Sequence, residues 1–374
     1  MGGQKIDNSD KPLVYKGRAS ASNQVSRFDA NTRESFDDGW GNLDEDLAPL
    51  KTEVAIDASR SVINYVSSPD IPFDRTINPY RGCEHGCIYC YARPSHAYLG
   101  YSPGLDFESR LLAKPDAPDL LKKELAKPSY QSAPIALGMN TDAYQPIERE
   151  YRITRAILEV LAECNHPFSL VTKSSLVERD IDVIAPMAAK GLATIFVTIT
   201  TLDRHIARKS EPRAAAPERR LETLRRLSEA GIPTGVMVAP VIPALTDFDM
   251  ENILQQAKHA GAGRAGYVFL RLPRELSQLF QEWLQLNFPL KAEHVMSLVR
   301  QSRGGKDYDA NFKTRMKGEG LFAELLSKRF KLACQRFELN RERVSFNSSL
   351  FKVPESWRDA GKPETRKSPQ MSLF

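Results

Sequence analysis

Residues 78–93 read NPYRGCEHGCIYCYAR and hold three of the five cysteines in this 374-residue chain. Cys83, Cys87 and Cys90 follow the spacing C-x3-C-x2-C. Thiolates this close in sequence can converge on one soft metal site, and a cubane iron–sulfur cluster is the usual occupant. A [4Fe–4S] cluster needs four ligands, and this run supplies three. The spacing therefore predicts a cluster with one iron left open to bind a molecule that reacts.

A structural zinc site is the alternative interpretation of the same cysteines. Such a site needs a fourth Cys or His ligand, usually in paired spacings, and the chain has no second C-x2-C pair. His85 and His96 lie close enough in sequence to complete a zinc site. The zinc alternative therefore stays open at this point.

The composition is that of a water-soluble globular protein, with 41% hydrophobic and 26% charged residues. No apolar run approaches the roughly 20 residues that span a bilayer, so we expect no membrane segment. Residues 1–6 lack the apolar core of a signal peptide. Cys164 and Cys334 stand far apart, without the spacing of a disulfide framework. These features predict a cytoplasmic protein.

Strand-like runs alternate with helical periodicity through the middle of the chain. Strands are predicted at 52–56, 61–66, 134–138, 168–172, 193–200, 234–241 and 266–272, and an extended piece at 106–114. Helices are predicted at 117–126, 148–164, 180–190, 216–230, 247–259, 292–303 and 318–337. Such alternation favours a parallel sheet with crossover helices. With the strand that enters the cysteine run, the pattern indicates about six β/α units, short of the eight in a closed TIM barrel.

The cysteine motif, with an aromatic residue directly before its third cysteine, resembles the radical S-adenosylmethionine (SAM) superfamily. The resemblance implies an α/β fold, a partial (β/α)6 TIM-type barrel, and the count of β/α units agrees with it. It also implies a [4Fe–4S] cluster whose open iron chelates SAM. One electron, from a donor such as flavodoxin or ferredoxin, then cleaves SAM to a 5′-deoxyadenosyl radical.

In parallel β/α folds the site lies at the carboxyl ends of the strands, where polar residues are available to bind a ligand. The resemblance implies that residues at this level seat SAM. The candidates are Tyr89, Asn140, Thr141, Asp142, Lys173, Thr198 and Arg213. Two alternatives remain, because Asp142 is also a good helix N-cap and Thr198 is a good strand former.

A closer resemblance, over roughly residues 77–272, is to the spore photoproduct lyase branch, also called DNA repair photolyase-like. It rests on residues 87–91, the Thr141-Asp142 turn and Lys173, and it implies repair or modification of DNA or another nucleic acid. The lyases carry a hydrogen-donating cysteine three residues before that aspartate, but this chain has Met139, whose thioether has no S–H. We therefore expect no spore photoproduct repair by the cysteine route, and the catalytic residue stays unassigned.

The last part of the chain is basic. Residues 301–374 contain sixteen Lys and Arg against nine Asp and Glu, although the whole chain has a net charge of only +5. A basic surface suits a polyanionic partner such as nucleic acid. A solvated charged surface without a partner is the alternative.

The final residues, from Gln370 to Phe374, read QMSLF, and we expect the apolar side chains among them to be exposed. Exposed apolar clusters usually mark a partner. The segment resembles the peptides by which bacterial proteins bind the replication sliding clamp, and this resemblance predicts such a partner. The alternative is an end that folds back onto the domain.

The pattern predicts four regions. They are a flexible N-terminal arm at 1–50, a radical SAM barrel at 51–275, a C-terminal helical cap at 276–350 and a basic flexible tail at 351–374. Two other functions remain open alongside a nucleic-acid enzyme. One is a radical SAM enzyme acting on a protein or small molecule, and the other is a non-catalytic, metal-binding protein that associates with nucleic acid or the clamp.

Overall fold

The computed structural model describes residues 15–28, 50–342 and 345–359. No helix among these residues is long and apolar enough to cross a bilayer. The segment from Gln370 to Phe374, predicted to bind a sliding clamp, lies outside the described residues.

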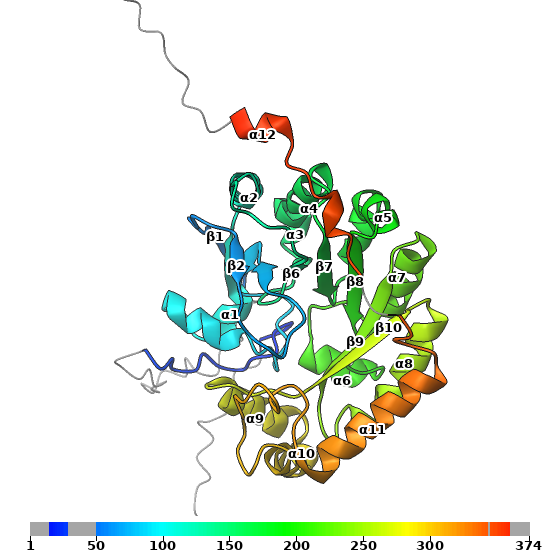
Figure 1. Ribbon diagram of the computed structural model, residues 1–374. Helices are drawn as coiled ribbons and strands as arrows, with labels where there is room; N and C mark the ends of the chain where they lie inside the picture. The colour runs from blue at the N-terminus through cyan, green and yellow to red at the C-terminus, as the bar shows by residue number, and fades with distance from the viewer. Residues whose placement is uncertain (1–14, 29–49, 343–344, 360–374) are drawn as a thin grey trace, which may run out of the picture.

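Six parallel strands form the central sheet and lie inside a ring of helices (Figure 1). In sheet order they are β10 (Arg264–Phe269), β9 (Thr234–Val241), β8 (Ala193–Thr198), β7 (Phe168–Thr172), β6 (Ile135–Leu137) and β3 (Arg75–Ile77). The short strand β2 (Ile63–Tyr65) pairs antiparallel with β3 at the edge of the sheet. Strands β10 and β2 do not pair with each other, so the described sheet is open. The predicted partial (β/α)6 barrel is confirmed.

Amphipathic helices cover the outer face of this sheet (Figure 1). They are α2 (Ala117–Leu125), α4 (Ile153–Glu163), α5 (Ile181–Ala189), α7 (Pro217–Glu229) and α8 (Met250–His259). Helix α4 buries Ile153, Ile157 and Leu161, which recur every four residues and so share one face. Because helices cover one face and side chains fill the other, β8 is buried on both faces, as parallel strands usually are.

Four shorter helices lie in the strand-to-helix loops, on the side of the barrel where the site is expected. They are α3 (Glu148–Tyr151), η2 (Ser175–Asp180), α6 (Arg204–Ser210) and η3 (Asp247–Asp249). The single helix predicted at 148–164 is wrong, because the chain breaks at Arg152, whose φ is 51°. A left-handed residue of this kind ends a helix, and here it separates α3 from α4.

A second, three-stranded sheet holds the start of the cysteine run. Its order is β1 (Glu53–Ile56), β5 (Arg110–Ala113) and β4 (Tyr80–Arg81), and the short helices α1 (Leu105–Ser109) and η1 (Arg93–Leu99) flank it. The extended piece predicted at 106–114 is thus partly wrong, because its first residues form α1. The Asp106 N–H, at the start of α1, donates to the Asn23 side chain at 3.0 Å. A tertiary cap of this kind leaves no signal in the local sequence.

Residues 15–28 pack against the barrel domain, so the predicted flexible arm does not hold for this segment. Arg18, Ala19, Ser20 and Ser26 are buried there. The backbone N–H groups of Ala19 and Ser20 donate to the carboxylate of Glu108 at 3.1 and 3.0 Å. These bonds tie the segment to α1, beside which it runs in Figure 1.

The C-terminal region forms the two helices predicted there and three further helical elements. Its elements are α9 (Leu276–Asn287), α10 (Pro289–Gln301), α11 (Gly320–Arg336), η4 (Ser348–Leu350) and α12 (Glu355–Asp359). Helices α9 and α10 pack into a core cluster that also contains Ile88 and Tyr89 of the cysteine run. Helix α11 packs on α8, where Arg329 pairs with Glu251 at 2.7 Å.

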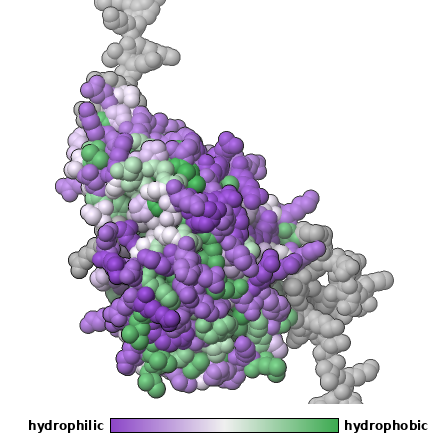
Figure 2. All heavy atoms as spheres, turned by 90° about the vertical axis from the view of Figure 1, so that its right-hand side faces the viewer, coloured by the Kyte–Doolittle hydropathy of each residue, from purple (hydrophilic) through white to green (hydrophobic). Residues whose placement is uncertain are grey.

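The outer side of α11 carries large exposed apolar side chains, namely Leu321, Leu325 and Leu332. Figure 2 shows the face of the molecule that carries α7, α8 and α11, with apolar side chains gathered toward its lower end. The first residues of the predicted flexible tail are also placed against the fold. Trp357 is buried, and its indole N–H donates to Glu163 at 3.1 Å.

Candidate active site

The three predicted cluster cysteines lie in the loop between β4 and η1. Two backbone hydrogen bonds of 3.0 Å hold this cysteine loop, one from the Cys83 N–H to the Phe107 carbonyl and one from the Ile88 N–H to the Ser210 carbonyl. The first two thiols are buried and the third is half-buried. The loop is therefore fixed from α1 on one side and from α6 on the other.

A fully buried ion pair supports the cysteine loop. Arg93 Nη2 lies 2.5 Å from Glu108 Oε1, and both side chains are 0% exposed. Arg93 also donates to the carbonyls of Cys87 (2.9 Å) and Gly86 (3.0 Å). This pair was not predicted from the sequence. Arg93 closes the cysteine motif and could have been suspected, but nothing in the local sequence marks Glu108.

The three thiols share one environment. Burial raises the pKa of Cys83, and the charges of Asp142, Cys87 and Cys90 raise it further. Burial also raises the pKa of Cys87 and Cys90, while the Lys173 ammonium opposes this effect at both. The thiols are thus close enough to affect one another, and they are neutral until a cation or a cluster stabilises the thiolates.

The donor set fits a cluster better than a single ion. No three His, Cys, Asp or Glu side chains among the described residues are arranged to hold one metal ion. In a cubane each thiolate binds a different iron, so the thiols need not converge on one point. The two histidines that could complete a zinc site face other groups. His96 Nε2 lies 2.8 Å from the Arg110 carbonyl oxygen, and His85 Nδ1 lies 3.3 Å from an Asp142 oxygen.

Tyr89 belongs to a buried polar network behind the cysteine loop. Its hydroxyl donates to the Glu211 carboxylate and lies 3.1 Å from the Thr200 hydroxyl. Arg220 pairs with the same carboxylate and donates to the Thr198 carbonyl at 3.0 Å. Glu211 and Arg220 were not predicted from the sequence, although Glu211 lies two residues before the predicted Arg213. The network joins the ends of β8 and α6 to the cysteine loop.

The predicted turn after β6 is tied into the protein. The Asn140 N–H donates to the Asn78 side chain at 2.8 Å, and the Thr141 hydroxyl donates to the Gly82 carbonyl at 2.7 Å. Both partners belong to the segment that enters the cysteine loop. Asn140 is exposed, whereas Thr141 is buried. Of the two, only the Asn140 side chain faces solvent.

Hydrogen bonds from three residues hold the Asp142 carboxylate in place. Its carboxylate accepts hydrogen bonds from the Tyr144 N–H (2.8 Å), the Thr172 hydroxyl (2.7 Å) and the Lys173 N–H (2.8 Å). Burial raises the pKa of Asp142, but the charge of nearby His85 and these bonds outweigh burial and lower it to about 2. Asp142 therefore joins β6 to β7 as a permanent carboxylate. It does not cap α3, whose N-cap residue is Ile147.

The two predicted cations both reach the cysteine loop. The Lys173 Nζ atom lies 5.7 Å from the centre of the Tyr89 ring. Within the described part of the chain this ammonium makes no ion pair. Arg213 Nη2 lies 2.9 Å from a Glu84 oxygen, and its side chain is 37% exposed. The fold thus gathers Tyr89, Asp142, Lys173 and Arg213 around the cysteines.

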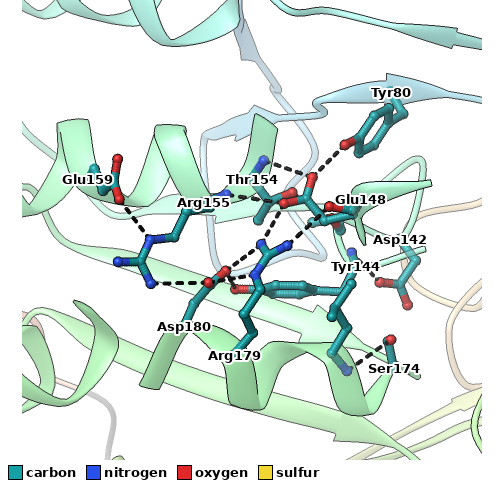
Figure 3. A network of polar contacts seen from close by, with 12 residues as sticks. Tyr80, Asp142, Tyr144, Glu148, Thr154, Arg155, Glu159, Ser174, Arg179 and Asp180 are labelled. Atoms are coloured by element: carbon teal, nitrogen blue, oxygen red, sulfur yellow. Dashed lines mark hydrogen bonds and ion pairs between the residues drawn. The ribbon is translucent and has the colours of Figure 1, made fainter. Parts of the chain in front are cut away.

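A second buried network supports the same end of the barrel (Figure 3). Glu148 accepts a hydrogen bond from Tyr80 and pairs with Arg179 at 2.7 Å, while Asp180 pairs with Arg179 at 2.8 Å and accepts from Tyr144 at 2.9 Å. Burial raises the pKa of Tyr80, and the Glu148 charge adds to the effect. Because the buried carboxylates of Glu148 and Asp180 each have several partners, this network acts as a scaffold for the loops after β6 and β7.

An open cleft of about 510 Å³ adjoins the cysteine loop. It is lined by Gly82 and Tyr91 of the cysteine run, by Met139 and Asn140 after β6, and by Arg271 after β10. Its other charged lining residues are Arg81, Lys114 and Arg315, and its other aromatic ones are Phe73, Tyr80 and Tyr98. No Asp or Glu lines the cleft in the described residues. This cleft could not be predicted from the sequence, because its walls come from segments that lie far apart along the chain.

Comparison with known proteins indicates the family of this chain. A family model described as the radical SAM superfamily matches residues 77–257. An uncharacterized protein of Mycobacterium tuberculosis is 35% identical over 245 residues, which cover 65% of this chain and 72% of the relative. A protein of Pseudomonas phage M6, named radical SAM Nalpha-GlyT isomerase, is 25% identical over 61% of this chain and 46% of its own length. A structure of spore photoproduct lyase has a TM-score of 0.49 at 15% identity, over 76% of this chain and 78% of that one.

Proposed function

This chain belongs to the radical SAM superfamily, and we propose that it is a radical SAM enzyme that acts on nucleic acid. Cys83, Cys87 and Cys90 would hold a [4Fe–4S] cluster and leave one iron open. When bound, the cluster would supply one electron that cleaves SAM to methionine and a 5′-deoxyadenosyl radical. A small electron carrier such as flavodoxin or ferredoxin would deliver that electron.

The protein's own residues would seat SAM around the cysteine loop. Lys173 is the strongest candidate for the SAM carboxylate, because its half-buried ammonium has no ion-pair partner in the described chain. Arg213 and Asn140 are exposed enough to reach a ligand, whereas Thr198 is buried. We assign Tyr89, Thr141 and Asp142 to positioning, because their polar side-chain atoms already have protein partners.

The single observation that carries the nucleic-acid substrate is the cleft beside the cysteine loop. Four cationic residues and four aromatic residues line it, of which Lys114 and Tyr80 are buried, and no acidic residue does so in the described chain. Phosphates bind cations and bases stack on aromatic rings, so a nucleotide matches both features. The basic region at 301–374 supports the same substrate class, and Arg315 of that region lines the cleft.

The reaction would differ from spore photoproduct repair by the cysteine route. Met139, which occupies the expected position of the hydrogen-donating cysteine, lines the cleft. The other two cysteines are buried elsewhere. The Cys164 thiol donates to the Val160 carbonyl at the end of α4, and Cys334 lies in α11. The proposal is therefore a radical SAM modification or repair reaction whose hydrogen donor is not one of these cysteines.

Anaerobic cluster reconstitution tests the proposal. The reconstituted protein is expected to show the electron paramagnetic resonance signal of a reduced [4Fe–4S] cluster and to release 5′-deoxyadenosine with SAM and dithionite. Cys87→Ala should abolish both, whereas Cys164→Ala, which removes a distant buried thiol, should leave both intact. A wild-type protein that binds zinc and forms no 5′-deoxyadenosine would contradict the enzyme assignment. Absence of oligonucleotide binding would contradict only the substrate class.

A further inference from the structure

Arg271 differs from the other cations that line the cleft. Arg315 makes a bidentate pair with Asp70 at 2.5 and 2.6 Å. Arg81 pairs with Asp57 at 2.5 Å, and the Lys114 Nζ atom lies 3.9 Å from the same carboxylate. Arg271 forms no ion pair with any carboxylate of the described chain. Its charge acts on the Asp70 carboxylate only without direct contact, because Arg315 holds that carboxylate in the bidentate pair.

The Arg271 guanidinium group is also short of hydrogen-bond partners. Its Nε atom is buried without a partner, and Nη1 makes only a 3.6 Å contact with the Met316 sulfur. The group lies 5.0 Å from the centre of the Tyr91 ring, within the range of a cation–π contact. An arginine offers five N–H donors in a rigid fork, and most of them are unused here. Such a group is preorganised for an anion with several oxygens.

A second arginine stands behind the first and increases the local positive charge. Arg303 is buried and donates to the carbonyls of Leu270 (2.7 Å) and Thr314 (2.9 Å), the residues that directly precede Arg271 and Arg315. Its Nε atom also lacks a partner. Burial, followed by the charge of Arg271, lowers the pKa of Arg303 to about 10, while Asp309, Tyr308 and Glu319 oppose the shift. Two like charges are thus held together where an anion would relieve their repulsion.

We propose that Arg271, backed by Arg303, forms an anion subsite that binds a phosphate group of the substrate. The inference rests on the proposed function and specifies how the cleft would recognise a nucleotide. Tyr91 lies between this subsite and Cys90, and it is 42% exposed. A phosphate at Arg271 would therefore hold the adjoining base near the Tyr91 ring, at the entrance to the cysteine loop.

Binding to the reconstituted holoenzyme tests the subsite. The ligands are a labelled oligothymidine, thymidine 5′-phosphate, thymidine and SAM. Arg271→Gln should weaken binding of the oligonucleotide and of thymidine 5′-phosphate on the order of tenfold to a hundredfold, and leave thymidine and SAM unchanged. The slope of log affinity against log salt for the oligonucleotide should fall by about 1. Arg271→Lys should lie between wild type and Arg271→Gln.

Arg225→Gln is the matched control, because it removes an equal charge from the exposed outer face of α7. It should bind every ligand as wild type does, and cluster absorbance should be equal in all variants. The subsite is overturned if Arg271→Gln binds phosphate-bearing ligands as tightly as wild type, if no phosphate-bearing ligand binds, or if SAM binding weakens instead. Arg271-dependent binding of thymidine 5′-phosphate without oligonucleotide binding would keep the subsite and refute the nucleic-acid substrate. If Arg271→Gln binds the oligonucleotide as tightly as the wild type does, the subsite is refuted and the nucleic-acid substrate is kept.

Discussion

Arg93 and Glu108 show how single residues determine the geometry of the candidate site. Their ion pair is fully buried, and both groups make further hydrogen bonds. Arg93 donates to four backbone carbonyls, and Glu108 accepts from Ala19 and Ser20. A buried ion pair is stable only when its partners are satisfied in this way. The pair therefore fixes the cysteine loop before any cofactor is bound.

His166 is a buried residue whose protonation should limit stability in acid. Its Nδ1 lies 2.9 Å from the Pro167 carbonyl oxygen, and its Nε2 lies 2.7 Å from the Tyr130 hydroxyl. Burial lowers the pKa of His166 to about 4, from an ordinary value of 6.5. Between about pH 6.5 and pH 4 the His166 imidazole is therefore protonated in the unfolded chain but neutral in the folded chain. The free energy of unfolding therefore decreases as the pH falls from 6.5 toward 4, and it increases again as the pH rises.

We predict that His166→Gln will lose less stability than the wild type between pH 7 and pH 5. The wild-type free energy of unfolding should drop by about 2 kcal/mol more than that of the variant over this interval. Urea unfolding of the apoprotein at both pH values measures the difference. Equal pH dependence of the two proteins would show that His166 is not held neutral.

The cysteine loop is the element on which the site depends, and glycine determines its path. Gly86 has a φ of 66°, and a Cβ added there would lie 2.7 Å from a Glu108 carboxylate oxygen. Gly100, at the end of η1, has a similar φ of 72° but no atom within 4 Å of such a Cβ. Alanine substitutions at these two glycines therefore distinguish the effect of backbone strain from that of steric overlap.

Gly86→Ala is expected to destabilise the protein by roughly 2–4 kcal/mol, because left-handed strain adds to overlap with a buried carboxylate. Gly100→Ala should cost about 1 kcal/mol, from strain alone. Chemical denaturation and the cluster absorbance per chain after reconstitution measure both effects. Only Gly86→Ala should also lose cluster. Equal losses in the two variants would mean that contact with Glu108 does not matter.

At the scale of the whole molecule, segments distant in sequence close around one end of the barrel. Residues 15–28 bind α1, helices α9 and α10 share a core with the cysteine loop, and Arg315 brings the basic C-terminal region into the cleft. We propose that the remaining apolar end, from Gln370 to Phe374, binds the replication sliding clamp. Such a contact would bring the enzyme to replicating DNA.

The full-length protein is expected to bind purified clamp, and changing both Leu373 and Phe374 to Ala should reduce this binding at least tenfold. The physical reason is the loss of the apolar side chains that would enter a pocket on the partner. Surface plasmon resonance measures the affinity. Changing Lys367 to Ala, just before the segment, serves as the control. Unchanged clamp binding by the double variant would refute the proposal.

Local pattern in the sequence was sufficient for the fold class and for the cysteines as candidates. Strand runs, helix periodicity and the C-x3-C-x2-C spacing are patterns among residues that are close in sequence. They can therefore be recognised without knowing which distant segments pack together. The same reasoning failed at Arg152, where a left-handed residue splits the predicted helix, and at α1, whose cap comes from Asn23. It also assigned residues 15–28 to a flexible arm, because polar composition conceals the contacts that they make with Glu108.

The sequence by itself determined that this chain has the three-thiol motif and the six parallel strands of a radical SAM protein. Only the tertiary structure decided which groups surround the thiols. Glu108, Glu211 and Arg220 reach the cysteine loop, and Arg271 reaches the cleft, from segments that lie far apart along the chain. The physical reason is that a buried charge is stabilised by partners brought close in space, and pairing of this kind leaves no periodic trace in the sequence.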